Sequence, residues 1–246
     1  LTISHSTLSG NIAGADGGGI FSSEALTISD STLSGNIAFG TGGGFYFFST
    51  LETANVNQST ISSNSAAYGG GVHVGSGQLN LTNSTISENS ATGDGGGIFN
   101  DGTIWTYNAT IAFNHADSDD LNGGNGGGVF NDTGANFFPR NSVVAGNTGT
   151  GSELDDCTGT IGVFGHGWFS SLSGCTPVQG VGTAEWDLIG SLAELGLLQF
   201  NGGPTRTHAL QAGSPMIDSG FACNGTGDPS IDQRGGLRTP AGTCDP

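Results

Sequence analysis

The sequence predicts an all-β protein, a right-handed parallel β-helix in which each coil takes about 25 residues. Three observations predict it: a run of three glycines recurs at nearly constant intervals, a motif ending in asparagine recurs out of phase with it, and apolar residues stand two apart. One such unit is too small to bury its own apolar face, so neighbouring units must stack around a continuous core. Parallel connections within a sheet are almost always right-handed, which gives the handedness.

The glycine runs mark one point of each coil. They occur at Gly17–Gly19, Gly42–Gly44, Gly69–Gly71, Gly95–Gly97 and Gly126–Gly128. A phosphate-binding loop would need a lysine after its glycines, and the chain contains no lysine. We therefore expect these positions to be places where side chains must be absent, so that the turn into the next strand runs tightly over the neighbouring coil.

Each unit contains three short stretches with the character of strands. They are the residues directly after the glycines, a motif such as "LTIS" at 26–29, and a motif such as "STIS" at 84–87. Alternation with period two indicates strands, and the repeat shows no helical period. We expect Leu79, Leu81 and Ile86 to stack in the core with like residues from the coils above and below.

The "STIS" type of motif ends in an asparagine in every unit. These asparagines are Asn11, Asn36, Asn64, Asn89, Asn114 and Asn147. We expect a ladder along one turn, in which each carboxamide bonds to the next coil. The alternative is that each is an ordinary turn residue, and the regular recurrence favours the ladder.

The glycine runs stop before residue 151, which divides the chain into β-helix coils at 1–150 and an irregular segment at 151–246. A solenoid must protect its open end from pairing with other chains, so we expect 151–246 to supply the last irregular coils and a cap stapled by disulfides. The cysteines all lie there: Cys157, Cys175, Cys223 and Cys244. Local pairing, first with second and third with fourth, is the simplest of three connectivities. Paired cysteines indicate an oxidising, extracytoplasmic location.

The C-terminal segment also carries a family resemblance. It reads "DLIGSLAELGLLQFNGGPTRTHALQAGSPMIDSG" at 187–220 and "DQRG" at 232–235, after coils that combine "GGGI", "LTI" and "STIS" motifs. In these motifs the chain resembles bacterial choice-of-anchor Q domain proteins, and more distantly polymorphic outer-membrane protein repeats and pectate-lyase-like folds. The resemblance implies a secreted or surface-anchored bacterial protein, whose anchoring signal would lie beyond Pro246.

Charge and hydropathy narrow the range of partners. Acidic residues number 21 against four arginines, which gives a formal net charge of −17. Such a chain repels polyanions, so we expect no nucleic-acid partner. No apolar run is long enough to span a membrane, so we expect no membrane insertion in this segment. Carbohydrate, another surface protein, or a second copy packed laterally or stacked on a coil end are the partners left open.

Two short motifs are also found in pectin-degrading enzymes. The "DD" at 155–156 and the "GHG" at 165–167 match motifs of polygalacturonase-like hydrolases. In those enzymes the motifs lie about one coil apart, whereas here they lie nine or ten residues apart. No arginine or lysine follows His166 before Arg206. We therefore expect the match to be a coincidence, and assign no catalytic residue.

One loop offers oxygen ligands for a metal. It carries Asp117, Asp119, Asp120 and Asn122. Carboxylate and carboxamide oxygens at short spacing suit calcium, although this spacing is not that of an EF-hand. An acidic, solvated loop is the alternative, and calcium is the only cofactor that the sequence leaves open.

Regular coils with few basic residues favour a structural or adhesive module at the cell surface, or secreted, without catalytic activity. The alternatives are a polysaccharide lyase or glycoside hydrolase of the pectate-lyase-like class and a self-assembling extracellular filament subunit. Aromatic residues at 45–48, 68, 105, 107 and 137–138 offer stacking platforms for sugar rings. We expect half or more of them to lie in the core.

Overall fold

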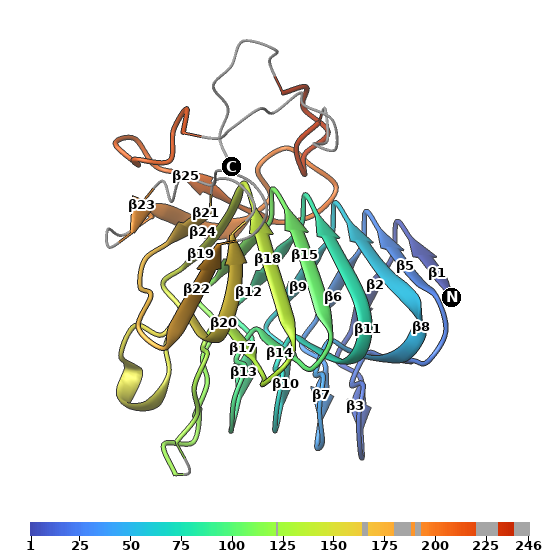
Figure 1. The fold of residues 1–246 in the computed structure, drawn as a ribbon. Helices are drawn as coiled ribbons and strands as arrows, with labels where there is room; N and C mark the ends of the chain where they lie inside the picture. Colours follow the sequence, from blue (N-terminus) through green and yellow to red (C-terminus); the bar gives the residue numbers. More distant parts are fainter. Residues whose placement is uncertain (122, 164–166, 180–187, 190–192, 220–230, 239–246) are drawn as a thin grey trace.

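The computed structural model describes residues 1–121, 123–163, 167–179, 188–189, 193–219 and 231–238. Over this part the chain winds into a parallel β-solenoid of about seven coils (Figure 1). The prediction of an all-β parallel β-helix with about 25 residues per coil is confirmed. Among the described residues the only helix is the 3-10 turn η1 (Thr150–Ser152), and no helix is long and apolar enough to cross a membrane.

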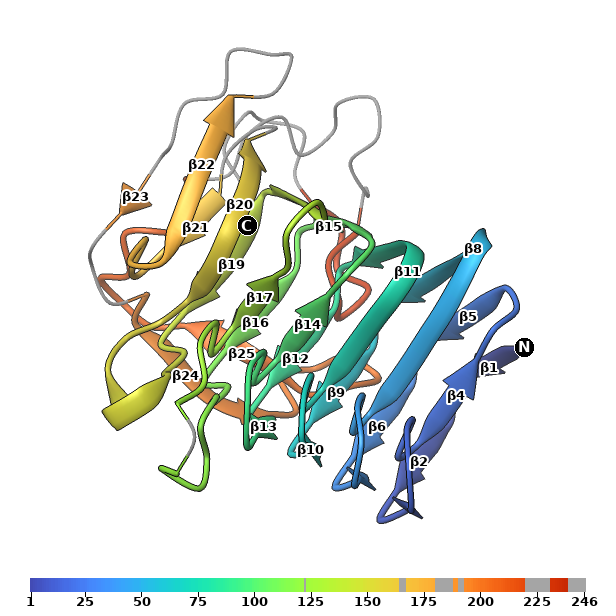
Figure 2. The same cartoon turned by 60° about the horizontal axis from the view of Figure 1, so that its bottom comes forward.

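Three parallel sheets line the coils, and the first of them is the largest. Its strands are β1 (Thr2–Ser4), β4 (Ile20–Ser22), β5 (Leu26–Ser29), β8 (Phe45–Asn57), β11 (Val72–Thr82), β14 (Ile98–Asn100), β15 (Thr103–Tyr107), β17 (Val129–Asn131), β18 (Asn136–Arg140), β20 (Cys157–Val163) and β22 (Cys175–Gln179). Figure 2 shows the long strands β8 and β11 running side by side, as their register requires.

The second sheet contributes one strand to each coil, and the third sheet is short. The second comprises β2 (Thr7–Ser9), β6 (Thr32–Ser34), β9 (Thr60–Ser62), β12 (Thr85–Ser87), β16 (Thr110–Ala112), β19 (Ser142–Ala145), β21 (Gly167–Phe169) and β23 (Leu188–Ile189). The third comprises β3 (Ile12–Ala13), β7 (Ile37–Ala38), β10 (Ser65–Ala66) and β13 (Ser90–Ala91). A separate antiparallel pair joins β24 (Leu195–Gln199) to β25 (Thr207–Leu210).

The strands are divided among the sheets differently from the sequence-based expectation. The stretch after the glycines and the "LTIS" stretch belong to one sheet, and in β8 and β11 they merge into a single strand. The third strand of a coil is instead the residue pair that follows the ladder asparagine. Two residues are too few to show an alternation, so the periodicity could not reveal this strand.

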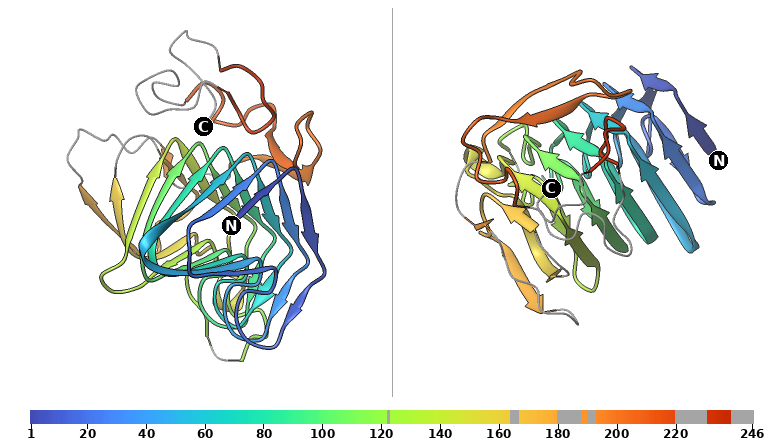
Figure 3. Two further views of the ribbon diagram at one scale, coloured as in Figure 1. Left: turned by 90° about the vertical axis from the view of Figure 1, so that its right-hand side faces the viewer. Right: turned by 90° about the horizontal axis from the view of Figure 1, so that it is seen from above.

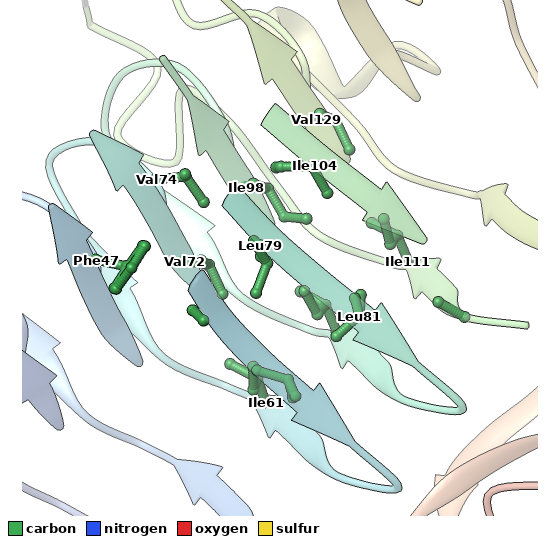
Figure 4. Packing of buried hydrophobic residues seen from close by; sticks show 14 of the residues in the cluster. Phe47, Ile61, Val72, Val74, Leu79, Leu81, Ile98, Ile104, Ile111 and Val129 are labelled. Carbon is green, nitrogen blue, oxygen red and sulfur yellow. The ribbon is translucent and has the colours of Figure 1, made fainter. Parts of the chain in front are cut away.

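Like residues stack along the interior, as the repeat predicts. Ile86 pairs in register with Ile61 on one side and Ile111 on the other. All three are fully buried, together with Leu79 and Leu81, in one core cluster that runs through the coils (Figure 4). Burying each such side chain contributes about 2 kcal/mol, so continuity between coils is the main source of stability.

The glycine triplet Gly95–Gly97 shows why side chains are excluded at the turn. Gly95 has a φ of +70°, which other residues rarely adopt. A Cβ on Gly96 would lie 2.4 Å from the backbone carbon of His115, and one on Gly97 would lie 2.6 Å from the carbonyl oxygen of Gly128. The first glycine therefore supplies a backbone conformation, and the other two allow neighbouring coils to approach. The expectation for these runs is confirmed.

The six asparagines of the "STIS" motifs form a hydrogen-bonded row along one turn. In each step the Oδ1 atom of one asparagine accepts hydrogen bonds from the backbone N–H and the Nδ2 of the asparagine one coil earlier, at 2.9–3.1 Å. From Asn36 onward, Nδ2 also donates to a carbonyl oxygen; Asn89, for example, donates to Ile61 at 3.0 Å. Every polar atom of the carboxamide is thus used inside the turn.

The row of asparagines ends on a carboxylate. Asp156 is fully buried, and its Oδ1 accepts both hydrogen bonds from Asn147, at 3.0 and 3.1 Å. Its Oδ2 accepts from the Ser170 hydroxyl and the Ser171 N–H, at 2.6 and 2.8 Å. Burial raises the pKa of Asp156, while these four hydrogen bonds oppose the rise. We term Asp156 the ladder terminus.

The C-terminal segment first continues the coils through β20, β21 and β22, and its residues 193–219 and 231–238 then lie along the second sheet. Figure 3 shows this segment, in orange and red, running back from the yellow coils toward the blue ones. Thr60 in β9 donates to the Arg206 carbonyl oxygen at 2.6 Å, and the Gln233 carboxamide accepts from Thr85 in β12 at 2.8 Å. The described residues 193–219 and 231–238 thus cover a lateral face of the coils, and a cap over the open end stays a prediction.

A disulfide connects Cys157 in β20 with Cys175 in β22, with their Cα atoms 5.5 Å apart. The predicted local pairing of these two cysteines is confirmed, and the bond joins two consecutive coils. The predicted partners Cys223 and Cys244 lie outside the described residues.

Candidate functional site

The outer side of the first sheet carries a shallow hollow over β8, β11 and β15. Its lining residues are Asn55, Gln78, Asn80, Thr82, Trp105 and Tyr107, and its volume is about 430 Å³. They share the outer side because their neighbours in β11 and β15, such as Leu79 and Ile104, point into the core. The register places Asn55, Asn80 and Trp105 beside one another in three successive coils. We call this feature the outer hollow.

One side of the outer hollow is a wall of two aromatic rings. Trp105 packs against Phe138 of the following coil, with ring centroids 4.3 Å apart and an interplanar angle of 34°. Tyr107 is nearly parallel to Trp105, at 13°, with centroids 6.5 Å apart. In the preceding coil the paired residues are the much shorter Asn80 and Thr82. This step in side-chain size opens the hollow beside the two rings, which both line it.

The floor of the outer hollow is a chain of carboxamides. The Gln78 Nε2 donates to the Asn80 Oδ1 at 2.7 Å, and the Asn80 Nδ2 donates to the Asn55 Oδ1 at 2.9 Å. These bonds fix the orientation of each carboxamide. They do not use the Gln78 Oε1 or the Asn55 Nδ2, so the floor presents both an acceptor and a donor to a ligand.

All six residues that line the outer hollow are uncharged. General acid–base catalysis needs a titratable group within hydrogen-bonding reach of the reacting atom, and tyrosine is the only lining residue with a titratable side chain. The combination of flat apolar rings and fixed carboxamides is typical of a binding site that recognises a polar, ring-shaped ligand.

A second aromatic feature follows the first sheet along the solenoid axis. It consists of the second residue after each glycine triplet: Phe21, Tyr46, His73, Phe99 and Phe130. Neighbouring ring centroids are 4.7–5.4 Å apart, so the rings pack on one another. We call this feature the aromatic row. Such contacts stabilise the sheet. The row could have been predicted from the sequence, because a ring residue stands second after each glycine triplet.

His73 is the one titratable imidazole in the aromatic row. Its Nε2 lies 2.9 Å from the Asp101 Oδ2, and its ring is almost fully buried. Burial lowers the pKa of His73, and the hydrogen bond with Asp101 offsets part of that effect. The contacts make His73 a part of the sheet surface rather than a free base.

The aromatic residues singled out from the sequence divide between core and surface. Phe45, Phe47 and Phe137 are fully buried. The other six are partly or largely exposed. The expectation that half or more would lie in the core was therefore wrong. Alternation along β8 and β18 explains the division, since every second ring points outward.

The acidic loop does not gather its carboxylates. Asp117 is buried and its Oδ1 accepts from the Gly123 N–H at 3.2 Å, whereas Asp119 and Asp120 are exposed. Asn122 lies outside the described residues. Within the described ranges, no group of three or more histidine, cysteine, aspartate or glutamate side chains is placed to hold a metal ion. Calcium at this loop stays a prediction.

The "DD" at 155–156 belongs to the architecture of the turn. Asp156 is the ladder terminus, and the Asp155 Oδ2 accepts from the Gly126 N–H at 2.7 Å. Burial raises the pKa of Asp155 to about 6, and the neighbouring charge of Asp156 adds to the rise. His166 of the "GHG" lies outside the described residues, so the second motif of the enzyme-like pair is not placed.

Searches against protein-family models, curated proteins and solved structures find no match for this chain. The resemblance to choice-of-anchor Q domain proteins therefore stays a prediction from the sequence motifs.

Proposed function

We propose that this chain is a non-catalytic, adhesive β-solenoid module of a secreted or surface protein, and that it binds uncharged carbohydrate in the outer hollow. The observation that carries the proposal is the wall formed by Trp105 and Tyr107 beside the carboxamide floor. The C–H faces of a sugar ring pack on aromatic rings, and its hydroxyl groups exchange hydrogen bonds with carboxamides.

Charge supports an uncharged ligand. The net charge of −17 repels acidic polysaccharides, and no lining residue of the hollow offers a cation to a carboxylate or sulfate. The same lining gives no support to the alternative of a polysaccharide lyase or hydrolase, because those reactions need an acid or base beside the bond that breaks.

The extracellular location rests on the disulfide between Cys157 and Cys175. Disulfides persist in oxidising compartments and are rare in the cytosol. A location outside the cell would give the module access to polysaccharides of a surface or matrix.

Affinity electrophoresis in gels containing neutral polysaccharides tests the proposal. We expect at least one such polymer to retard the wild-type chain, and Trp105→Ala to migrate freely. Phe39→Ala is the matched control, because Phe39 is 70% exposed and lies outside the hollow, and this variant should bind like the wild type. Failure of every neutral polymer to retard the wild type would overturn the proposal. Release of new reducing ends during incubation would establish an enzyme instead.

A further inference from the structure

We infer that the outer hollow contains two adjoining sugar subsites arranged along the strands, so that a glycan chain lies across the solenoid rather than along its axis. The inference rests on the proposed carbohydrate binding and deepens it. One subsite lies between Trp105 and Asn80, and the other lies between Tyr107 and Thr82, because these pairs are in register across β11 and β15.

The direction follows from the two rings of the wall. Trp105 and Tyr107 stand two residues apart on β15, with centroids 6.5 Å apart, close to the rise of about 6.6 Å expected for two strand residues. Trp105 packs on Phe138 of the following coil with 34° between the ring planes, and from this contact we infer that the normal to its ring lies closer to the solenoid axis than to the strand. Tyr107 is parallel to it. Two sugar rings stacked on this wall are therefore joined along the strand.

A glycan chain that runs along the solenoid axis would make fewer stacking contacts. A chain running along the axis toward later coils meets the Trp105 ring standing in its path, with Phe138 directly behind. The aromatic row does extend along the axis, but each ring packs on its neighbours at 4.7–5.4 Å. The ring faces that could stack on sugars are therefore largely occupied by neighbouring rings, and mainly ring edges are left for a ligand.

The two subsites are chemically unequal. The Trp105 subsite has the larger ring and the linked carboxamides of Asn80 and Gln78, whereas the Tyr107 subsite has a smaller ring and the Thr82 hydroxyl. We expect the first to bind a single sugar unit by itself, and the second to add affinity only when a linked unit reaches it.

Isothermal titration calorimetry with mono-, di- and trisaccharides cut from a retained polymer tests the two subsites. The disaccharide should bind about tenfold more tightly than the monosaccharide, with a smaller gain for the trisaccharide. Tyr107→Ala should remove the gain of the disaccharide and leave the monosaccharide unchanged. Trp105→Ala should weaken both more than tenfold. Equal losses for both sugars in Tyr107→Ala would overturn the two-subsite arrangement.

A bulky residue on the axial path tests the orientation. Thr27 on β5 pairs with Asn55, one coil beyond the hollow. Thr27→Trp would obstruct an axial chain and leave a chain along β11 free, so we expect trisaccharide affinity to change less than twofold. A loss of tenfold or more would show an axial chain and overturn the inference, while the proposed function would stand.

Two outcomes separate the inference from the proposal on which it rests. If the wild type binds a glycan, Trp105→Ala loses it, and Tyr107→Ala weakens the mono- and the disaccharide equally, the two-subsite arrangement fails while binding in the outer hollow stands. If the wild type binds no neutral glycan, the proposed function itself fails. Thermal unfolding of each variant checks that loss of binding does not come from loss of the fold.

Discussion

The two lateral faces of the solenoid differ in how far they are exposed to solvent. From β9 onward the outer side of the second sheet is covered by residues 193–219 and 231–238, and Val143, Trp168 and Met216 form a second apolar cluster there. The outer side of the first sheet is open and carries the outer hollow. We call them the covered face and the open face. Both are built from strands of similar alternation, so exposure is decided by a distant segment and not by the strands themselves.

The largest expected difference between the two faces is the loss of stability when a tryptophan on each is replaced by alanine. Trp168 on the covered face is 2% exposed, so Trp168→Ala should lower the free energy of unfolding by about 3 kcal/mol through the cavity it leaves. Trp105→Ala on the open face should cost about 1 kcal/mol, because it removes a ring contact at a surface. Urea denaturation of both variants measures the difference. Equal losses would mean that the C-terminal segment does not bury the covered face in solution.

Glutamine gives a smaller contrast. The buried Gln233 bonds to Ser59, Thr60, Thr85 and Thr205, and so joins the C-terminal segment to two coils. Gln233→Ala should destabilise the fold by about 2 kcal/mol, since it leaves buried partners unpaired. Its counterpart Gln78→Ala should cost less than about 0.5 kcal/mol. Hydrogen exchange offers a local measure: protection in β25 should fall in the first variant only, and unchanged protection in both would contradict the assigned contact.

The smallest expected difference between the two faces concerns one histidine on each and the pH dependence of stability. On the covered face, His208 Nε2 lies 2.8 Å from the Ser87 hydroxyl and Nδ1 lies 2.6 Å from the Gly196 carbonyl oxygen. Burial lowers the pKa of His208, although this carbonyl and the charge of Glu88 oppose the shift. The folded state therefore takes up the proton less readily than the unfolded chain. The contribution of His208 to stability should fall as the pH drops below the unfolded value of about 6.5 and passes through the lower folded pKa, whereas the raised pKa values of Asp155 and Asp156 act in the opposite direction.

Variants at both histidines test that dependence. Between pH 7.5 and pH 5 the melting temperature of the wild type should fall relative to that of His208→Gln, because only the wild type loses the contribution of His208. His73→Gln on the open face should reduce the dependence less, because the Asp101 carboxylate at 2.9 Å favours the protonated ring. An identical pH dependence of wild type and His208→Gln would rule out His208 as the responsible group.

The coils could be predicted from the sequence because the features that produce them recur in every unit. Gly96 must lack a side chain for a reason that every triplet shares, and Asn89 repeats the bonds of Asn64. The covered face could not be predicted, since Thr60 and Arg206 meet across 146 residues with no shared motif. The outer hollow was less predictable from the sequence than the coils and more predictable than the covered face. It could have been found by aligning "LNL" at 79–81 with "IWT" at 104–106, which sets Asn80 beside Trp105.

The ladder terminus gives the solenoid a direction that can be used in engineering. Each asparagine accepts from the coil before it through Oδ1, so a duplicated coil inserted between Asn64 and Asn89 would find matching donors and acceptors on both sides. A coil added after Asp156 would not, because a carboxylate receives hydrogen bonds on both oxygens and has no N–H to offer in return. Coils can therefore be inserted within the row of asparagines. The row ends at Asp156, where a carboxylate oxygen stands in place of the carboxamide nitrogen.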